Sequence, residues 1–83
     1  MSNDKPSDPK VAFGRRLREL RVARRLSQEQ LGEMAGLDRT YISGCERGNR
    51  NISIENIYRL SSALGVSPAE LLKPAKPNKL RQK

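Results

Sequence analysis

Residues 28–47, QEQLGEMAGLDRTYISGCER, carry the pattern that decides the fold. Two short helical runs in this stretch are separated only by Gly36, Leu37 and Asp38. Gly36 fits the left-handed residue that ends a helix, and Asp38 fits the residue that caps the next one. Gly32 leaves room for a close approach, because a larger side chain would push the two helices apart. The stretch therefore predicts two helices joined by a three-residue turn, the geometry of a helix-turn-helix unit.

The flanking segments predict three more helices. Apolar residues at helical spacing, bounded by Ser, Gly and Pro, place them at about residues 11–25, 54–64 and 68–73. No strand pattern occurs, so we expect an all-α fold, a compact five-helix domain over residues 10–73. The polar segment 1–9 predicts a disordered arm, and the basic, proline-containing segment 74–83 predicts a disordered tail.

Composition restricts the function classes. The 83 residues include 17 Lys and Arg against 9 Asp and Glu, which gives a net charge of +8 and favours a polyanionic partner, nucleic acid before membrane. With no His and one Cys, the chain lacks the parts for His-based catalysis or a Cys/His zinc cluster. We expect no enzyme, no cofactor, no metal site, no membrane partner and no small-molecule ligand. No apolar run approaches the ~20 residues that span a bilayer, so we expect a cytoplasmic, nucleoid-associated protein.

A family resemblance follows from these residues. Residues 11–73 resemble the phage repressor and Cro-like helix-turn-helix family, also called the XRE family. The block 37–44, LDRTYISG, together with residues 46–47 and 50–51, is similar more narrowly to the controller proteins of restriction-modification systems. The resemblance implies a lambda-repressor-like fold and a small dimeric regulator that binds double-stranded DNA.

In such units the second helix, here the reading helix at about residues 39–47, enters the major groove with its first residues at the base edges. The expected base contacts are Arg39, Thr40, Tyr41 and Ser43. Arg39 can donate two hydrogen bonds to a guanine. Gly44 stands where many members of the family carry a long polar side chain, so we expect specificity to depend on Arg39, Thr40 and DNA shape.

Phosphate contacts are expected on both sides of the reading helix, where they would hold its register on the duplex. The start of the preceding helix should meet the DNA backbone, and the resemblance adds the loop that follows the reading helix. The expected phosphate-contacting residues are Ser27, Gln28, Arg47, Asn49, Arg50, Asn51 and Ser53. Arg50 could instead enter the minor groove.

Glu46 lies near the expected DNA face, where an acid is unfavourable unless a cation balances it. The resemblance implies an ion pair with Arg21 of the first helix, which would orient the reading helix without contacting DNA. Cys45 is expected to be a small core residue rather than a redox-sensing thiol. The arginines within residues 15–18 are expected to form a mostly solvated face, part of which adds long-range attraction to DNA.

One domain of this kind reads only a few base pairs, and two-fold dimers bind half-sites about one helical turn apart. We therefore expect a homodimer on a palindromic operator, acting as an activator or a repressor. The expected dimer interface consists of Ile57, Leu64, Val66, Leu71 and Leu72. Two alternatives remain open: an antitoxin-type autoregulator that binds a toxin, and a protein-binding coactivator or adaptor that reuses the fold.

Overall fold

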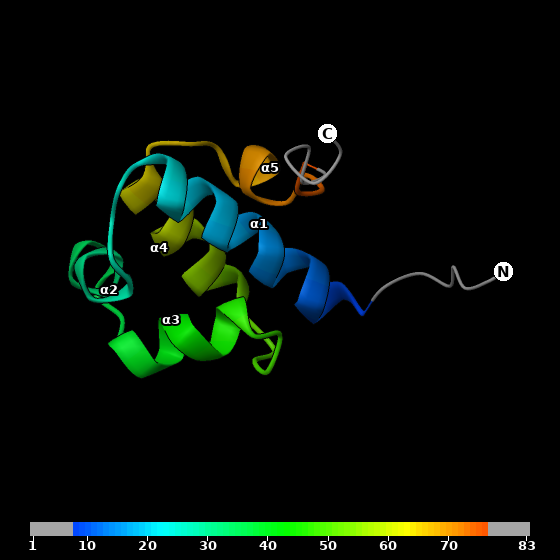
Figure 1. Ribbon diagram of the computed structural model, residues 1–83, viewed down its shortest axis with the longest axis horizontal. Coiled ribbons are helices and arrows are strands. Elements are labelled where there is room, and N and C mark those ends of the chain that lie inside the picture. Colours follow the sequence, from blue (N-terminus) through cyan, green and yellow to red (C-terminus); the bar gives the residue numbers. More distant parts are fainter. Residues whose placement is uncertain (1–7, 77–83) are drawn as a thin grey trace, which may run out of the picture.

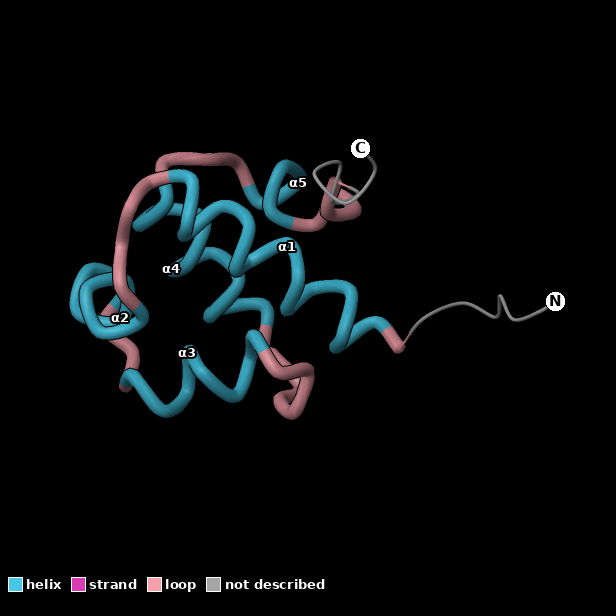
Figure 2. Tube along the Cα trace, viewed as in Figure 1, coloured by secondary structure: helices cyan, strands magenta, loops and turns pink. Residues whose placement is uncertain are grey.

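The computed structural model describes residues 8–76 as five helices without a strand among them, which confirms the all-α prediction. The helices are α1 (Pro9–Ala23), α2 (Gln28–Ala35), α3 (Arg39–Glu46), α4 (Ile54–Leu64) and α5 (Pro68–Leu71). α1 runs across the molecule with α3 on one side and α5 on the other (Figure 1). α2 packs against α3 and α4, and short loops join the helices (Figure 2). Residues 1–7 and 77–83, most of the predicted arm and tail, lie outside the described residues.

Side-chain caps set the start of every helix. Each cap accepts a hydrogen bond from a backbone amide in the first turn, and the capping residues are Asp8, Ser27, Asp38, Ser53 and Ser67. Gly36 and Gly65 cap the ends of α2 and α4, and their φ angles of 75° and 73° favour glycine. None of the described helices is both long and apolar enough to cross a membrane.

α1 lies two residues earlier than the predicted range 11–25. It begins at Pro9 because Asp8 caps it and proline suits the first helical position, where no intrahelical N–H bond is lost. It ends at Ala23 because Arg25 adopts a φ of 58° and its amide bonds back to the last turn. The first helix therefore includes Pro9, which we predicted to belong to the disordered arm.

The other differences lie at helix ends and in the tail. α3 and α5 end at Glu46 and Leu71, one and two residues before their predicted ends. Lys76, predicted to belong to the disordered tail, donates its amide to the carboxylate of Glu19 at 3.0 Å. The first residues of the tail are therefore attached to α1.

The core is small and aliphatic, and all five helices contribute to it. Its buried members are Leu17, Leu31, Ala35, Ile42, Cys45, Leu60, Leu64 and Leu71. Met34 lies three residues after Leu31, a spacing typical of one buried helix face, yet it is 55% exposed. The buried face of α2 is centred on Leu31, Gly32 and Ala35, because Gly32 faces the turn before α3, and this rotates Met34 out of the core.

Arg16 is buried, although we predicted that the arginines within residues 15–18 form a mostly solvated face. Its Nε donates to the carbonyl oxygen of Glu70 at 2.9 Å, and its Nη1 donates to Glu19 at 2.8 Å. These partners make burial of the guanidinium acceptable. Arg15 and Arg18 are exposed, so the cluster divides into one arginine that attaches α5 and two that face outward.

Candidate nucleic-acid interface

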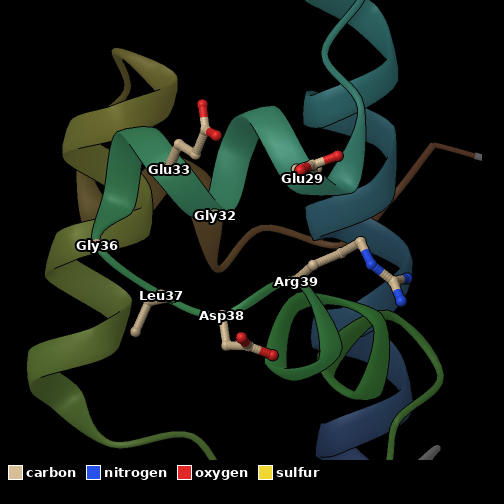
Figure 3. A pocket seen from close by; sticks show the side chains of 7 residues that line it. All are labelled: Glu29, Gly32, Glu33, Gly36, Leu37, Asp38 and Arg39. Carbon is tan, nitrogen blue, oxygen red and sulfur yellow. The ribbon is translucent and has the colours of Figure 1, made fainter.

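α2, the turn at residues 36–38 and α3 form the helix-turn-helix unit that the sequence predicts. The turn depends on close backbone packing. A Cβ atom at Gly32 would lie 2.5 Å from the carbonyl oxygen of Leu37, which is backbone and cannot move aside easily. Figure 3 shows Gly32 above the turn and the Arg39 side chain extending from the start of α3. The glycine thus sets how closely α3 can lie beneath α2.

The turn borders a shallow depression (Figure 3), lined by Glu29, Gly32, Glu33, Gly36, Leu37, Asp38 and Arg39. Three carboxylates surround this depression, yet Arg39 forms no ion pair with any acid in residues 8–76. Asp38 is engaged by Thr40, whose hydroxyl and amide both donate to it and lower the pKa of the Asp38 carboxyl. Arg39 is therefore exposed at the start of α3, with its guanidinium available to a ligand outside the domain.

The other residues predicted to contact bases differ in their exposure and in the hydrogen bonds that they already form within the domain. Thr40 is exposed, and although its hydroxyl hydrogen is directed to Asp38, the oxygen can still accept a hydrogen bond. Ser43 is half-buried, and its hydroxyl accepts a hydrogen bond from Arg47 one turn later. The start of α3 is thus the part of the helix whose polar groups are most open to an outside partner.

Tyr41 and Arg50 contact each other on the surface of α3. The Arg50 guanidinium carbon lies 5.3 Å from the centroid of the Tyr41 ring, a cation–π arrangement. The Tyr41 hydroxyl accepts a hydrogen bond from Asn56 at 3.0 Å. Arg50 also covers Gly44, because a Cβ atom there would lie 2.8 Å from the Arg50 Nε. An arginine from the loop thus occupies the space beside Gly44.

The predicted phosphate contacts lie on two sides of α3. Ser27 and Ser53 are exposed and cap α2 and α4. Gln28 is half-buried, and its side-chain amide donates to Glu46 at 3.1 Å. The predicted phosphate-contacting residues in the loop that follows α3 are exposed, namely Arg47, Asn49, Arg50 and Asn51. The loop that carries them projects beside α3 (Figure 2).

Arg21 and Glu46 form a bidentate ion pair behind α3. The Arg21 Nε donates to Glu46 Oε2 at 2.6 Å and Nη2 donates to Oε1 at 2.9 Å, with side chains 9% and 4% exposed. The hydrogen bonds to Glu46 raise the pKa of Arg21 and outweigh the opposing effect of burial. A third donor, Arg21 Nη1, reaches the carbonyl of Leu26 at 2.7 Å. The pair attaches the end of α3 to α1 and neutralises the acid.

Gly14 gives α1 a second contact with α3, which the sequence analysis did not identify. A Cβ atom at Gly14 would lie 2.7 Å from the carbonyl oxygen of Glu46 and closer still to that of Cys45. The two helices therefore meet backbone to backbone. The available signal was a glycine inside a strong helical pattern, which often marks close packing.

Two predicted dimer residues are not available for an interface. Leu64 and Leu71 are 2% and 0% exposed and belong to the core of the single chain. The prediction of an interface through them is therefore wrong. The physical reason is that a core with so few large side chains needs both leucines.

Other apolar side chains remain accessible on α4, in the loop before α5 and directly after α5. Leu72 is 56% exposed, while Ile57 and Val66 are half-buried against the core. Ile54 and Tyr58 of α4, which we did not predict, are 64% and 58% exposed. These five residues, here called the α4–α5 apolar face, are candidates for contact with another molecule.

Cys45 lies at the back of α3, where it is 1% exposed. Burial raises the pKa of its thiol to about 11. The thiolate is the reactive form of cysteine, so a buried thiol with this pKa is inert near neutral pH. The structure therefore assigns Cys45 to the core.

Comparisons with known proteins agree with this geometry. The helix-turn-helix family HTH_3 matches residues 17–71. Control protein C.BamHI of Bacillus amyloliquefaciens is 47% identical over 64 residues, which cover 76% of this chain and 79% of that protein. Control protein C.MunI of Mycoplasma sp is 42% identical over 66 residues, which cover 78% and 89%.

Solved structures show the same relationship. The crystal structure of the restriction-modification controller protein C.AhdI from Aeromonas hydrophila is 56% identical with a TM-score of 0.74, over 75% of this chain and 94% of that one. The DNA-binding domain of the P22 C2 repressor is 37% identical with a TM-score of 0.72, over 80% and 90%. These relatives are regulators, in agreement with the expectation that the chain is no enzyme. The chain belongs to the HTH_3 helix-turn-helix family, and it is a transcriptional regulator similar to the controller proteins of restriction-modification systems.

Proposed function

We propose that the protein binds a palindromic DNA operator as a homodimer, with α3 in the major groove. The observation that carries this proposal is the difference between the two ends of α3. Arg39 at its start is exposed and pairs with no described acid, whereas Glu46 at its end is buried against Arg21. A helix that enters a groove between phosphates needs this distribution, with the cation presented and the acid neutralised.

Base recognition would come mainly from the start of α3. The Arg39 guanidinium suits the N7 and O6 acceptors of guanine in the major groove. Thr40 offers a methyl group for thymine and an oxygen that can accept a hydrogen bond. Tyr41, with Arg50 on its ring, and Ser43 would face the groove further along the helix.

Phosphate contacts would hold α3 in register from both sides. Ser27 and Gln28 lie at the start of α2, and Ser53 lies at the start of α4. The exposed polar residues of the loop supply the remaining donors, namely Arg47, Asn49, Arg50 and Asn51. Because a phosphate contact carries no base information, these residues would contribute to affinity for any duplex.

The homodimer would form through the α4–α5 apolar face, without Leu64 and Leu71. Its exposed members Ile54, Tyr58 and Leu72 are large side chains that a partner subunit would remove from water. Pairing about a two-fold axis would place two α3 helices about one helical turn apart on the duplex. The position of the operator at a promoter would then decide whether occupancy activates or represses. We place this activity in the cytoplasm, at the nucleoid.

The central experiment is selection of bound duplexes from a random pool, followed by affinity measurements with variants. We expect a palindrome whose half-sites contain a guanine read by Arg39. Arg39→Ala should weaken binding by about 5- to 150-fold for each half-site, since a bidentate guanine contact is worth roughly 1–3 kcal/mol. Lys76→Ala, which removes the same charge beside α5, should have little effect. Recovery of no common sequence would contradict the proposal.

The dimer is tested separately by sedimentation. Tyr58→Glu puts a charge on an exposed position of α4, so the fold should survive while the dimer dissociates. Val22→Glu makes a similar change on exposed α1, outside the α4–α5 apolar face, and should leave the dimer intact. A wild-type protein that is monomeric at micromolar concentration would contradict this part of the proposal.

A further inference from the structure

Arg18 has an environment unlike that of its neighbours in the α1 cluster. Its side chain is 66% exposed, and its Nη1 lies 4.0 Å from Oε1 of Glu46. This distance is too long for a hydrogen bond, and Arg18 donates no side-chain hydrogen bond to any residue between 8 and 76. Arg15 is exposed and forms no ion pair with an acid among residues 8–76, and Arg16 attaches α5 to α1. Arg18 is thus an exposed guanidinium that lies near Glu46 without a hydrogen bond to it.

The carboxylate of Glu46 is neutralised without Arg18. Its two oxygens accept hydrogen bonds from Arg21 at 2.6 and 2.9 Å, and Oε1 also accepts one from Gln28 at 3.1 Å. The side chain of Glu46 is 4% exposed, so little of it remains for another partner. Two guanidiniums therefore lie beside one carboxylate, which leaves one positive charge in excess at the surface.

The excess charge lies where three helices meet. Glu46 is the last residue of α3, Gln28 is the first residue of α2, and Arg18 is in the middle of α1. Because Gln28 and Arg18 both approach the same carboxylate oxygen, the Arg18 guanidinium is near the first turn of α2. This is the side of α3 on which Ser27 and Gln28 are proposed to meet the DNA backbone.

We infer that Arg18 is a phosphate-binding residue, which contacts the DNA backbone beside the first turn of α2 while Arg21 neutralises Glu46. The inference rests on the proposed DNA binding and adds a contact from a helix outside the helix-turn-helix unit. A guanidinium presents a planar set of donors that matches two phosphate oxygens. Because the contact is to phosphate, it strengthens binding to any duplex and holds the register of α3 from the side of α1.

Salt dependence tests the contact directly. Affinities are measured by fluorescence anisotropy between about 50 and 200 mM salt. Two labelled duplexes of about 30 base pairs serve as probes, long enough for two half-sites one turn apart. One is the duplex selected by the wild-type protein and the other has the same base composition in scrambled order. The proteins are the wild type, Arg18→Ala, Arg18→Lys and Arg15→Ala, the last being the matched control from the same helix.

Arg18→Ala should lower the slope of log affinity against log salt by about 0.9 for each protomer, since one phosphate contact releases about that many counterions. The affinity should fall by the same factor on both duplexes. Arg18→Lys should keep the slope because it keeps the charge. Arg15→Ala should keep it because Arg15, unlike Arg18, forms no ion pair with Glu46. All variants should melt at the wild-type temperature, since both arginines are exposed.

Three outcomes would overturn the inference alone. An unchanged slope in Arg18→Ala excludes the contact. Equal losses of slope in Arg18→Ala and Arg15→Ala would indicate long-range attraction by α1 as a whole. A loss confined to the selected duplex would mean that Arg18 acts through Glu46 on the reading helix. If the wild-type protein binds neither duplex, the proposed function itself fails and the inference fails with it.

Discussion

α1 packs against α3 on one side and α5 on the other, and an Arg–Glu ion pair attaches each of them. The two ion pairs differ in how deeply they are buried. In the α3 contact, Arg21 and Glu46 are 9% and 4% exposed and Gly14 brings the two backbones together. In the α5 contact, Arg16 is equally buried, but its partner Glu70 is 46% exposed and lies 3.3 Å away. The reading helix is therefore attached by a buried bidentate pair, and α5 by a pair whose carboxylate is partly exposed.

The difference in burial indicates that α1 fixes the position of α3 more rigidly than that of α5. A buried ion pair is weak support for stability as such, but removing one partner leaves an uncompensated charge in the protein. The α3 contact therefore allows one orientation and penalises others strongly. The α5 contact can exchange part of its bonding for water, so we expect the region beside the α4–α5 apolar face to adjust more easily when a partner binds.

The largest expected effect is that of Arg21→Ala. It leaves Glu46 buried without its partner, so we expect a loss of about 3–5 kcal/mol in the free energy of unfolding, measured with urea. The double variant Arg21→Met with Glu46→Leu removes both charges and should regain most of that loss. A loss below about 1 kcal/mol in Arg21→Ala would show that the pair is far more hydrated than the structure indicates.

Gly14→Ala tests the backbone part of the α3 contact. The added Cβ would lie 2.7 Å from the carbonyl oxygen of Glu46, so α1 and α3 must separate, at an expected cost of about 1–3 kcal/mol. Gly44→Ala is the matched control, because its Cβ meets only the flexible Arg50 side chain. Urea unfolding of both variants should show a clear loss for Gly14→Ala alone. Equal losses would contradict the backbone contact.

Arg16→Ala tests the α5 contact and should cost less, about 1–2 kcal/mol. The half-exposed Glu70 carboxylate can bind water once Arg16 is absent. Arg16→Lys keeps the charge but lacks the planar fork, so it should recover only part of the loss. The measurement is again urea unfolding. If Arg16→Ala costs as much as Arg21→Ala, the proposed difference in depth between the two contacts is wrong.

The smallest expected effect is a pH dependence of the α5 contact. Partial burial raises the pKa of Glu19, but hydrogen bonds from Arg16 and the Lys76 amide outweigh it, so the pKa lies below its usual value. A hydrogen bond from Lys73 lowers the pKa of Glu70. Because both folded-state pKa values are lowered, the stabilisation is present above the unfolded-state pKa of about 4.3 and is lost as pH falls through the folded-state values.

Thermal unfolding between about pH 6 and pH 2 measures this effect. The melting temperature should begin to fall below about pH 4.3. Glu19→Gln with Glu70→Gln should make this fall shallower, because neither amide titrates. A double variant with the wild-type pH profile would show that the two carboxylates contribute nothing measurable.

Much of the local structure was predictable. Ser27 with Gln30, and Asp38 with Thr40, supply caps within a few residues of the backbone groups they bond, so a linear pattern reveals them. The helix ends shifted by one or two residues because the last turns depend on small preferences, such as the positive φ of Arg25. The helix-turn-helix unit, α2 and α3 with the turn at residues 36–38, was predictable for the same reason.

The amino-acid sequence by itself determined the five helices, the turn at residues 36–38 and the family. Only the tertiary structure decided that Leu64 and Leu71 belong to the core, that Arg50 covers Gly44, and that Arg16 and Arg18 have opposite surroundings. The physical reason is how far apart along the chain the interacting residues lie. Caps and turns are local hydrogen bonds between neighbours in the chain, whereas burial and ion pairing depend on which helices share a core.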